Sequence, residues 1–416
     1  MKKSSTPNST KGNSLVADVL VVGGGLVGSM LACALGQAHV TVIVVDRDVP
    51  TILQATELDG RGTAISLSSQ RLLAGIGIWD EIMPRAGAIL DIRVADDDSL
   101  LFLHYNHADV SEEPFGWIVE NPVTRRALLR RLRTLPAVTF LAPTTVAHLD
   151  RDSGGVHATL TDGRQIEARL VVAADGRASP MRIAAGIGLT SWHYSQTAIV
   201  CTVAHQDSHH NVAHEHFLPA GPFAILPLAH SCQSSIVWTE RSQRVPFLMA
   251  LNDDAFLAEL EARFGDFLGG IRVAGPRFSY PLSLQFADAY VAQRLALAGD
   301  AAHGMHPLAG QGLNMGIRDV AALAEVIVDA ARLGLDVGEM SSLLRYQRWR
   351  RFDNMVMLAL TDVLNRLFSN DIELLRLARD MGLAMVNRLP PLKKLFMQHA
   401  MGTVGDLPRL LRGETL

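Results

Sequence analysis

Residues Ala17–Gly28 read ADVLVVGGGLVG, and this stretch decides the fold. Its first half, Ala17–Val22, is an apolar, β-branched run of strand length that ends in glycines. Leu26–Gly36 continues with small and apolar residues at helical spacing, and Val40–Val45 (VTVIVV) is a second apolar run of strand length. A strand, a helix and a second strand in this order predict a βαβ unit and therefore a parallel sheet.

The glycines of this stretch have the spacing G-x-G-x-x-G at Gly23, Gly25 and Gly28, and Asp46 closes the second strand. Glycine there permits a tight turn, close approach of the backbone to a pyrophosphate, and close packing of helix on strand. The N-terminus of the helix offers free N–H groups and a partial positive charge to the phosphates. Asp46 is placed to accept hydrogen bonds from an adenosine ribose. The spacing therefore predicts a dinucleotide-binding site.

A later strand, within Leu170–Arg182 (LVVAADGRASPMR), ends in Asp175-Gly176, which on its own indicates only a turn. A third acidic residue follows the strand that opens Leu295–Asp319 (LALAGDAAHGMHPLAGQGLNMGIRD). There Asp300 suits a polyol hydroxyl, such as that of a ribityl chain. The helix that opens near Gly312 directs its N-terminus at the preceding loop, which favours a negatively charged ring such as that of a reduced flavin.

The rest of the chain predicts further elements. Leu72–Met83 and Thr124–Leu135 look helical, residues 189–283 look mostly β, and Arg294–Ala298 is a short strand. From Gly312 onward, helices dominate.

The composition is that of a globular chain, with 416 residues of which 48% are hydrophobic and 19% charged, and a formal net charge of −4. The length predicts two or three packed units. The apolar fraction excludes intrinsic disorder, and the mildly acidic balance argues against nucleic acid as the main partner. Cys33, Cys201 and Cys232 form no C-x-x-C pair, which argues against a disulfide framework or a thiolate zinc site and favours a reducing compartment.

No segment reads as a targeting or membrane-spanning sequence. Residues 1–14 lack an apolar core, and the longest apolar stretch, Val16–Ala38, is interrupted by Asp18 and the glycines. Residues 341–416, however, carry 12 Lys and Arg against 7 Asp and Glu. This basic, Leu- and Met-rich region can sit against anionic lipid, or it is a helical cap with solvated arginines, which composition alone favours.

Five histidines cluster in a short segment: His205, His209, His210, His214 and His216. Histidines at helical spacing can bind zinc, but this segment runs into a predicted strand. We therefore expect a solvated, His-rich hairpin loop and no metal site. His303 and His306 are expected to be packed, hydrogen-bonded histidines.

Together these segments resemble the flavoprotein aromatic hydroxylases of the para-hydroxybenzoate hydroxylase class, which share the G-x-G-x-x-G motif, a central D-G and a late G-D. Within that class the chain is similar to the UbiH/UbiF/VisC (UbiI-like) family of FAD-dependent ubiquinone-biosynthesis hydroxylases. The likeness runs from about Ala17 to the C-terminus, and His306–Asn314 (HPLAGQGLN) is its most specific segment. The other segments that carry it are Asp59–Arg61, Ala64–Ser66, Gly75–Trp79, Gly116–Asn121, Trp192–Ala198, Glu215–Leu228, His303–Asp319, Thr361–Asp362 and Leu367–Ser369.

The resemblance implies an α/β fold with a FAD-binding Rossmann-like domain of the glutathione-reductase type. A mostly antiparallel β substrate domain is inserted into it, and a helical region follows. The expected boundaries are a flexible N-terminus at 1–14, a discontinuous FAD-binding domain at 15–80, 108–188 and 284–340, a substrate domain at 81–107 and 189–283, and a helical region at 341–416.

The resemblance also implies which residues hold FAD. Gly23, Gly25, Gly28 and Asp46 should hold the ADP half; Asp46 is shorter than the glutamate of many relatives and would bond one ribose hydroxyl rather than two. Arg61 and Arg125 resemble arginines that contact the phosphate or ribityl region, with surface arginines as the alternative. The other expected FAD-binding residues are Asp175, Gly299, Asp300, Gly312, Leu313 and Asn314.

Pro307 and Gly310 resemble the loop that faces the isoalloxazine ring, and they are the catalytic residues the resemblance implies; no acid or base is assigned. Trp192, Tyr194 and Phe217–Phe223 either line a substrate pocket or belong to the core, which is more usual for aromatic residues in a β domain.

The activity implied is that of a FAD-dependent monooxygenase that hydroxylates the ring of a polyprenyl-phenol intermediate of ubiquinone biosynthesis through a flavin C4a-hydroperoxide. NADH, NADPH or another donor would reduce FAD, and O2 would be the cosubstrate. The expected partners are the prenylated phenol, a membrane surface and other ubiquinone-biosynthesis proteins, but not nucleic acid. The expected location is cytoplasmic, peripherally at the inner membrane.

Two alternatives stay open: a hydroxylase of a small soluble phenol, and a non-catalytic FAD-holding scaffold in a biosynthetic complex. A flavin halogenase is excluded because that chemistry resembles one that requires an active-site lysine. This chain has none between Lys11 and Lys393.

Overall fold

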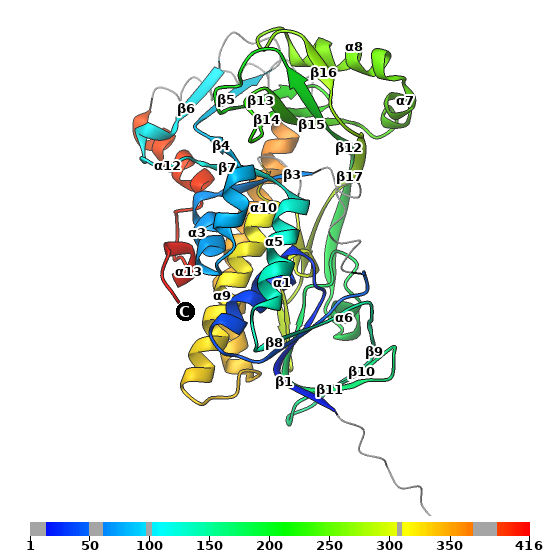
Figure 1. The fold of residues 1–416 in the computed structure, drawn as a ribbon, viewed down its shortest axis with the longest axis vertical. Helices are drawn as coiled ribbons and strands as arrows, with labels where there is room; N and C mark the ends of the chain where they lie inside the picture. Colours follow the sequence, from blue (N-terminus) through cyan, green and yellow to red (C-terminus); the bar gives the residue numbers. More distant parts are fainter. Residues whose placement is uncertain (1–13, 50–60, 97–101, 306–309, 369–388) are drawn as a thin grey trace, which may run out of the picture.

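The computed structural model describes residues 14–49, 61–96, 102–305, 310–368 and 389–416. Figure 1 shows two sheets toward opposite ends of an elongated molecule. The long strands β12 (Leu189–His205) and β17 (Phe278–Ala287) run between the two ends, and helix α10 (Met340–Phe368) lies alongside them.

The first sheet has the strand order β18-β19-β11-β1-β2-β8, and β1 pairs in parallel with both β2 and β11. The predicted βαβ unit is therefore present, with α1 as its crossover helix. Its strands are buried on both faces, which explains their continuous apolar sequences. The elements are β1 (Leu15–Val22), α1 (Leu26–Gln37), β2 (Val42–Val45), β8 (Val138–Leu141), β9 (Val146–Arg151), β10 (Val156–Leu160), β11 (Gln165–Ala173), β18 (Val291–Ala292) and β19 (Leu295–Leu297).

Helices cover this sheet. α1 contacts both α5 (Asn121–Arg133) and α9 (Gly312–Arg332). The helix predicted at Leu72–Met83 is instead two helices, α3 (Leu67–Gly75) and α4 (Trp79–Ile82), followed by the short η2 (Met83–Arg85). The break occurs at Gly77, whose φ of +75° does not fit a right-handed helix.

The second sheet has nine strands in the order β20-β17-β12-β15-β14-β13-β5-β6, with β16 paired to β12. Among its described strands, β13–β5 is the one parallel pair. The outer face of this nine-stranded sheet is covered by α7 (Val245–Ala250) and α8 (Asp253–Phe264). The sequence predicted a mostly β segment here and did not indicate these two helices. The remaining strands are β5 (Asp91–Asp96), β6 (Phe102–Asn106), β13 (Val212–Leu218), β14 (Gly221–Pro227), β15 (Gln233–Arg241), β16 (Ile271–Val273) and β20 (His303–Gly304).

A small antiparallel sheet lies between the two large ones, with the order β3-β7-β4, formed by β3 (Gly62–Ser66), β4 (Gly87–Ile89) and β7 (Gly116–Glu120). The chain ends in α12 (Pro390–Met401) and α13 (Arg409–Arg412), and α13 packs against α3 and α9. No helix in the described ranges is long and apolar enough to cross a membrane.

Candidate functional site

The three sequence motifs meet at one edge of the parallel sheet. From β1 the chain moves to β2 on one side and later to β11 and β19 on the other, so the strand order reverses between β1 and β11. Ligands of open α/β sheets bind outside the carboxyl ends of the strands at such a reversal. The loops at this edge begin at Gly23, Ala174 and Ala298, directly after β1, β11 and β19.

The glycine-rich loop has no room for side chains at two of its positions. Gly23 has a φ of +104°, and a Cβ there would lie 2.3 Å from the carbonyl oxygen of Ala174; a Cβ on Gly28 would lie 1.9 Å from the carbonyl oxygen of Gly23. At Gly25, by contrast, a Cβ would meet nothing within 4 Å, and no side chain caps the N-terminus of α1. The open space in front of free N–H groups fits a phosphate.

Asp46 closes β2 and is turned toward this loop. Its Oδ2 accepts a hydrogen bond from the N–H of Gly24 (2.5 Å), and its Oδ1 accepts one from the N–H of Asp48 (2.8 Å). Each carboxylate oxygen retains a second lone pair that a ribose hydroxyl can use.

Asp175 follows β11 and faces the same edge. Its Oδ2 accepts a hydrogen bond from the N–H of Met181 (3.1 Å), whereas its Oδ1 is buried without a partner in the described part of the chain. Burial raises the pKa of Asp175, and Ser179 and Arg182 oppose this shift by less. Arg182 donates to the carbonyl of Ala301 (2.8 Å) and so joins the Asp175 loop to the loop that contains Asp300.

Gly299 and Asp300 begin the short helix η4 (Gly299–Ala301). A Cβ on Gly299 would lie 2.9 Å from Val27 on α1, so this loop lies against the helix that opens the glycine-rich motif. The Asp300 side chain is exposed and makes no hydrogen bond within the described residues. It is therefore available to a ligand hydroxyl.

A buried ionic network, which the sequence did not predict, joins this loop to α9 and α10. Asp319 of α9 accepts hydrogen bonds from the N–H of Gly299 (3.0 Å) and from His303 (2.5 Å) through Oδ2, and from Arg350 (3.0 Å) through Oδ1. Asn354 also donates to Oδ1 (3.2 Å). Burial alone would raise the pKa of Asp319, but His303, Arg350 and Asn354 together hold it below its ordinary value. The sequence signal for this network is an aspartate inside the apolar run of α9.

The loop predicted to face the flavin lies only partly within the described residues, because Pro307 and His306 fall outside them. Gly310 has a φ of +63°, and its Cβ would lie 2.9 Å from the Cβ of Ala64 on β3. Gly312 and Leu313 then form the first turn of α9, which has no side-chain cap.

Asn314, predicted to hold FAD, uses its side chain inside the protein. Its Oδ1 accepts from the N–H of Ser66 (3.1 Å), and its Nδ2 donates to the carbonyl of Ala64 (2.9 Å) and to Gln311 (3.2 Å). These bonds fix the first turn of α9 to β3, so the geometry gives Asn314 a positioning role.

Of the two predicted arginines, Arg61 directly precedes β3 and Arg125 lies on α5. The guanidinium of Arg61 lies over the ring of Tyr280, 5.0 Å from its centroid, and the carbonyl of Arg61 accepts from the N–H of Asn121, the first residue of α5. Arg125 lies one turn further along α5.

The histidine cluster differs from its prediction as a solvated loop. His205, His209 and His214 are buried, and His205 bonds the hydroxyl of Ser234 (3.0 Å) and the carbonyl of Asp207 (2.6 Å). The segment was expected to be exposed because of its polarity, but β12 and β13 carry His205 and His214 into the sheet. His209, in the loop between these strands, bonds the carbonyl of Leu228 (3.1 Å). No group of three or more His, Cys, Asp or Glu side chains within the described ranges is arranged to hold a metal ion.

An apolar cluster lies close to the predicted flavin-facing loop. Met305 and Met315, on either side of that loop, pack with Leu284 and Leu358, and Trp192 and Tyr194 pack against them. Tyr194 and Trp192 also donate to Asp362 of α10, at 2.7 and 3.3 Å. Of the predicted pocket aromatics, Phe223 is instead core, fully buried with Trp238 on the outer face.

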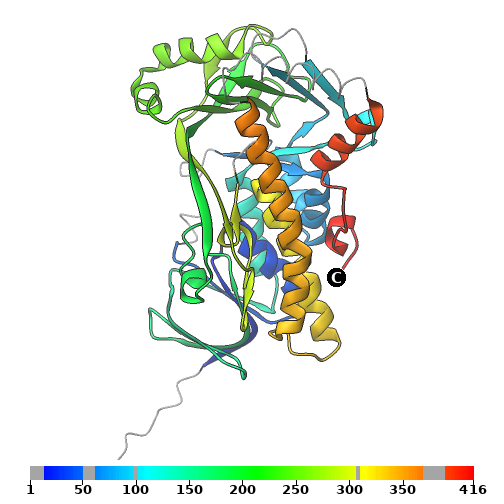
Figure 2. The same cartoon turned by 180° about the vertical axis from the view of Figure 1, so that it is seen from behind.

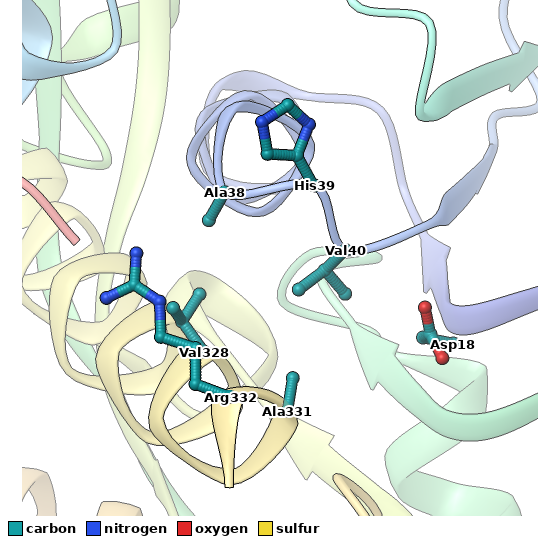
Figure 3. Close-up of a pocket in the computed structure, with 7 residues that line it drawn as sticks. All are labelled: Asp18, Ala38, His39, Val40, Val328, Ala331 and Arg332. Carbon is teal, nitrogen blue, oxygen red and sulfur yellow. The ribbon is translucent and has the colours of Figure 1, made fainter. Parts of the chain in front are cut away.

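A separate pocket of about 210 Å³ lies at the other end of the parallel sheet (Figure 3). Its lining includes Asp18 near the start of β1, His39 just after α1, and Arg332 at the end of α9. Because these positions lie at the opposite ends of their elements from the motifs, this pocket is not part of the site.

Three comparisons with known proteins bear on the site. The sequence profile of the family described as FAD binding domain matches residues 16–351. The ubiquinone hydroxylase UbiL of Rhodospirillum rubrum is 57% identical over 404 residues, which cover 96% of this chain and 94% of that protein. The 3-demethoxyubiquinol 3-hydroxylase of Escherichia coli is 35% identical over 389 residues, which cover 92% of this chain and 98% of that protein.

Among solved structures, the p-nitrophenol 4-monooxygenase PnpA of Pseudomonas putida has a TM-score of 0.78 at 21% identity, covering 95% of this chain and 100% of that one. At this identity the likeness concerns the fold.

Proposed function

The chain belongs to the family of FAD-dependent ubiquinone-biosynthesis hydroxylases, and from that premise we propose that it hydroxylates the ring of a prenylated phenol on the route to ubiquinone. The predicted family and fold class are confirmed: an α/β FAD-binding fold with a large, mostly antiparallel second sheet and C-terminal helices. The predicted domain boundaries and site residues stay predictions.

The observation that carries the proposal is the convergence of the three motifs at one edge of the sheet. Gly25 leaves open space before the uncapped N-terminus of α1, Asp175 has a buried oxygen without a partner, and Asp300 presents a free carboxylate. These groups fit the phosphates and hydroxyls of FAD. When bound, FAD supplies the oxygen chemistry of the reaction, and the protein supplies binding, orientation and a dry site.

The chain's own residues would divide this work. The glycine-rich loop and Asp46 would hold the ADP half, Asp300 the ribityl hydroxyls, and the uncapped N-terminus of α9 would stabilise negative charge on the ring. NADH, NADPH or another donor would supply the electrons, and O2 would be the cosubstrate.

We also propose that the protein works at the surface of the inner membrane, from the cytoplasmic side and together with other ubiquinone-biosynthesis proteins. Figure 2 shows α10 running along one face of the molecule, with no other described helix or strand in front of it. Phe352, Met355, Val356 and Val363 are exposed there, at a spacing that puts them on one side of the helix. An apolar stripe within a basic region suits a bilayer that contains anionic lipid and a prenylated substrate.

The double substitution Phe352→Ser, Val356→Ser is expected to weaken binding to vesicles of phosphatidylethanolamine and phosphatidylglycerol at least about tenfold, because two apolar side chains no longer enter the bilayer. Co-sedimentation measures this. Leu333→Ser, at an exposed position just after α9, is the matched control and should bind like the wild type. Equal sedimentation of the double variant and the control would remove α10 from the account.

A lipid profile of cells that lack the protein tests the proposed function. We expect a prenylated phenol that is missing one oxygen to accumulate, and to disappear when the protein is restored. The accumulated species also identifies the ring position. An unchanged ubiquinone pool in cells with no second hydroxylase would reject the proposal.

A further inference from the structure

Glu215 lies on the inner face of the nine-stranded sheet, the face turned toward β3, β7 and α10. It belongs to β13, where it pairs with Ala224 of β14 and Val94 of β5. Side chains alternate along a strand, so Ala213, Glu215 and Phe217 share one face while His214 and His216 share the other. His214 packs on Phe267 beside α8, with ring centroids 4.6 Å apart, which identifies the histidine side as the outer face.

The neighbours of Glu215 along β13 show which elements pack against the inner face of the sheet. Ala213 belongs to a buried cluster against which Ala64 of β3 packs, and Ala64 is the residue that a Cβ on Gly310 would touch. Phe217 belongs to a second cluster, which Leu367 near the end of α10 joins. Glu215 therefore lies between the strand that supports the predicted flavin-facing loop and the end of α10.

The carboxylate of Glu215 has no hydrogen-bond or ion-pair partner in the described part of the chain. Burial raises its pKa to about 7. The Glu215 side chain is only partly exposed. A ligand can therefore reach its carboxylate, which has lost most of its water without gaining a partner in the described residues, and such a group destabilises the folded protein. In the ligand-free protein the Glu215 carboxylate therefore lowers the free energy of unfolding. This is expected of a group whose hydrogen-bond partner is a ligand.

The other described titratable groups on the inner face do not neutralise the Glu215 carboxylate. Tyr105 of β6 is paired with Ile92, and burial raises its pKa to about 12, so it stays uncharged near neutral pH. Further along the face, Tyr280 of β17 lies under Arg61. On α10, Asp362 is held by Trp192 and Tyr194.

We propose that Glu215 accepts a hydrogen bond from the ring hydroxyl of the phenol substrate and thereby fixes which ring carbons face the flavin. This rests on the proposed function. A hydrogen bond to an ionised acceptor is short and strong, and it shifts electron density from the phenol oxygen into the ring. That density favours attack by an electrophilic oxygen at the carbons ortho and para to the hydroxyl. Apolar neighbours, among them Ala213, Ala224 and Phe217, leave the ring in a dry environment.

Glu215→Gln in the FAD-loaded protein tests this with two probes, a phenol bearing a farnesyl chain and the same compound with its ring hydroxyl methylated. The wild type is expected to bind the phenol at least about tenfold more tightly than the methyl ether, and the variant to bind both alike. With the phenol, kcat should fall roughly a hundredfold in the variant. The wild-type kcat should decline as pH falls through about 7, because the carboxylate is then protonated, whereas the variant should show no such decline.

Thermal unfolding separates this role from a structural one. The raised pKa means that the carboxylate favours folding at low pH and loses that contribution as pH rises through about 7. Glu215→Gln should therefore raise the Tm at pH values above 7. Glu240→Gln is the matched control: Glu240 is a buried glutamate of β15 that lies 3.7 Å from both Arg244 and Arg263, so its loss should lower the Tm and leave the preference for the phenol intact.

A Glu215→Gln protein that keeps the wild-type preference for the phenol and the wild-type pH profile would overturn the proposal. A lowered Tm with unchanged kinetics would assign Glu215 a structural role and also overturn it. If the wild type itself hydroxylates no prenylated phenol, the proposed function fails first, and that outcome is distinct because it appears before any substitution is made.

Discussion

Asp319→Ala is expected to lower the free energy of unfolding by about 3 kcal/mol, because the buried guanidinium of Arg350 then keeps only the partly exposed Asp353 as a carboxylate partner. Arg350 is 2% exposed and Asp319 is fully buried. The same substitution removes the acceptor for Gly299 and His303, so the loop that carries Asp300 should also loosen. Chemical denaturation of the FAD-free protein measures the first effect, and FAD affinity measures the second.

Asp253→Ala is the control for this prediction. Asp253 pairs with Arg277 at 2.9 Å, but its side chain is 86% exposed, and exposed pairs contribute about 0–1 kcal/mol.

The pH dependence of the free energy of unfolding gives an independent check. Because the pKa of Asp319 is lowered on folding, its contribution should be complete above the ordinary value of 3.8 and be lost as pH falls through the folded value below it. Equal denaturation midpoints for Asp319→Ala and Asp253→Ala would contradict the role given to the network.

Asp300→Ala should weaken FAD binding about ten- to a hundredfold and abolish turnover at ordinary FAD concentrations, without unfolding the protein. The reason is that a carboxylate that bonds ligand hydroxyls is lost, whereas no hydrogen bond among the described residues depends on that side chain. Flavin content after purification and titration of the apoprotein measure the change.

Asp300→Asn keeps an acceptor oxygen and should restore part of the affinity, and Asp254→Ala, an exposed aspartate of α8, should leave it unchanged. An Asp300→Ala protein that retains its full flavin content would remove Asp300 from the FAD site.

The parallel sheet was predictable because its signal is local. β1, α1 and β2 follow one another within Leu15–Val45, and their apolar periodicity and glycine spacing need no distant partner to be interpreted. The helices α7 and α8 were missed because α8 has a buried face of only a few residues, Phe256, Leu260 and Phe264, within a polar sequence.

The groups that meet in space from distant parts of the chain were harder to predict. The network around Asp319 joins Gly299, His303, Arg350 and Asn354, and no spacing rule relates α9 to α10. Asn314 has a side-chain role that the sequence did not indicate. The resemblance assigns it to FAD, but its amide is used by β3, a contact between residues about 250 apart. Glu215 opens one of the family segments, but only the fold shows that its carboxylate has no partner among the described residues.

A single turnover of the purified, FAD-loaded protein tests ring hydroxylation itself. The bound flavin is reduced chemically, which bypasses the electron donor, and the protein is then mixed with farnesyl-phenol and isotopically labelled oxygen gas. We expect mass spectrometry to detect a ring-hydroxylated product that carries one labelled oxygen atom and forms only in the presence of the phenol. Reoxidation of the flavin with no labelled product would contradict the proposed hydroxylation.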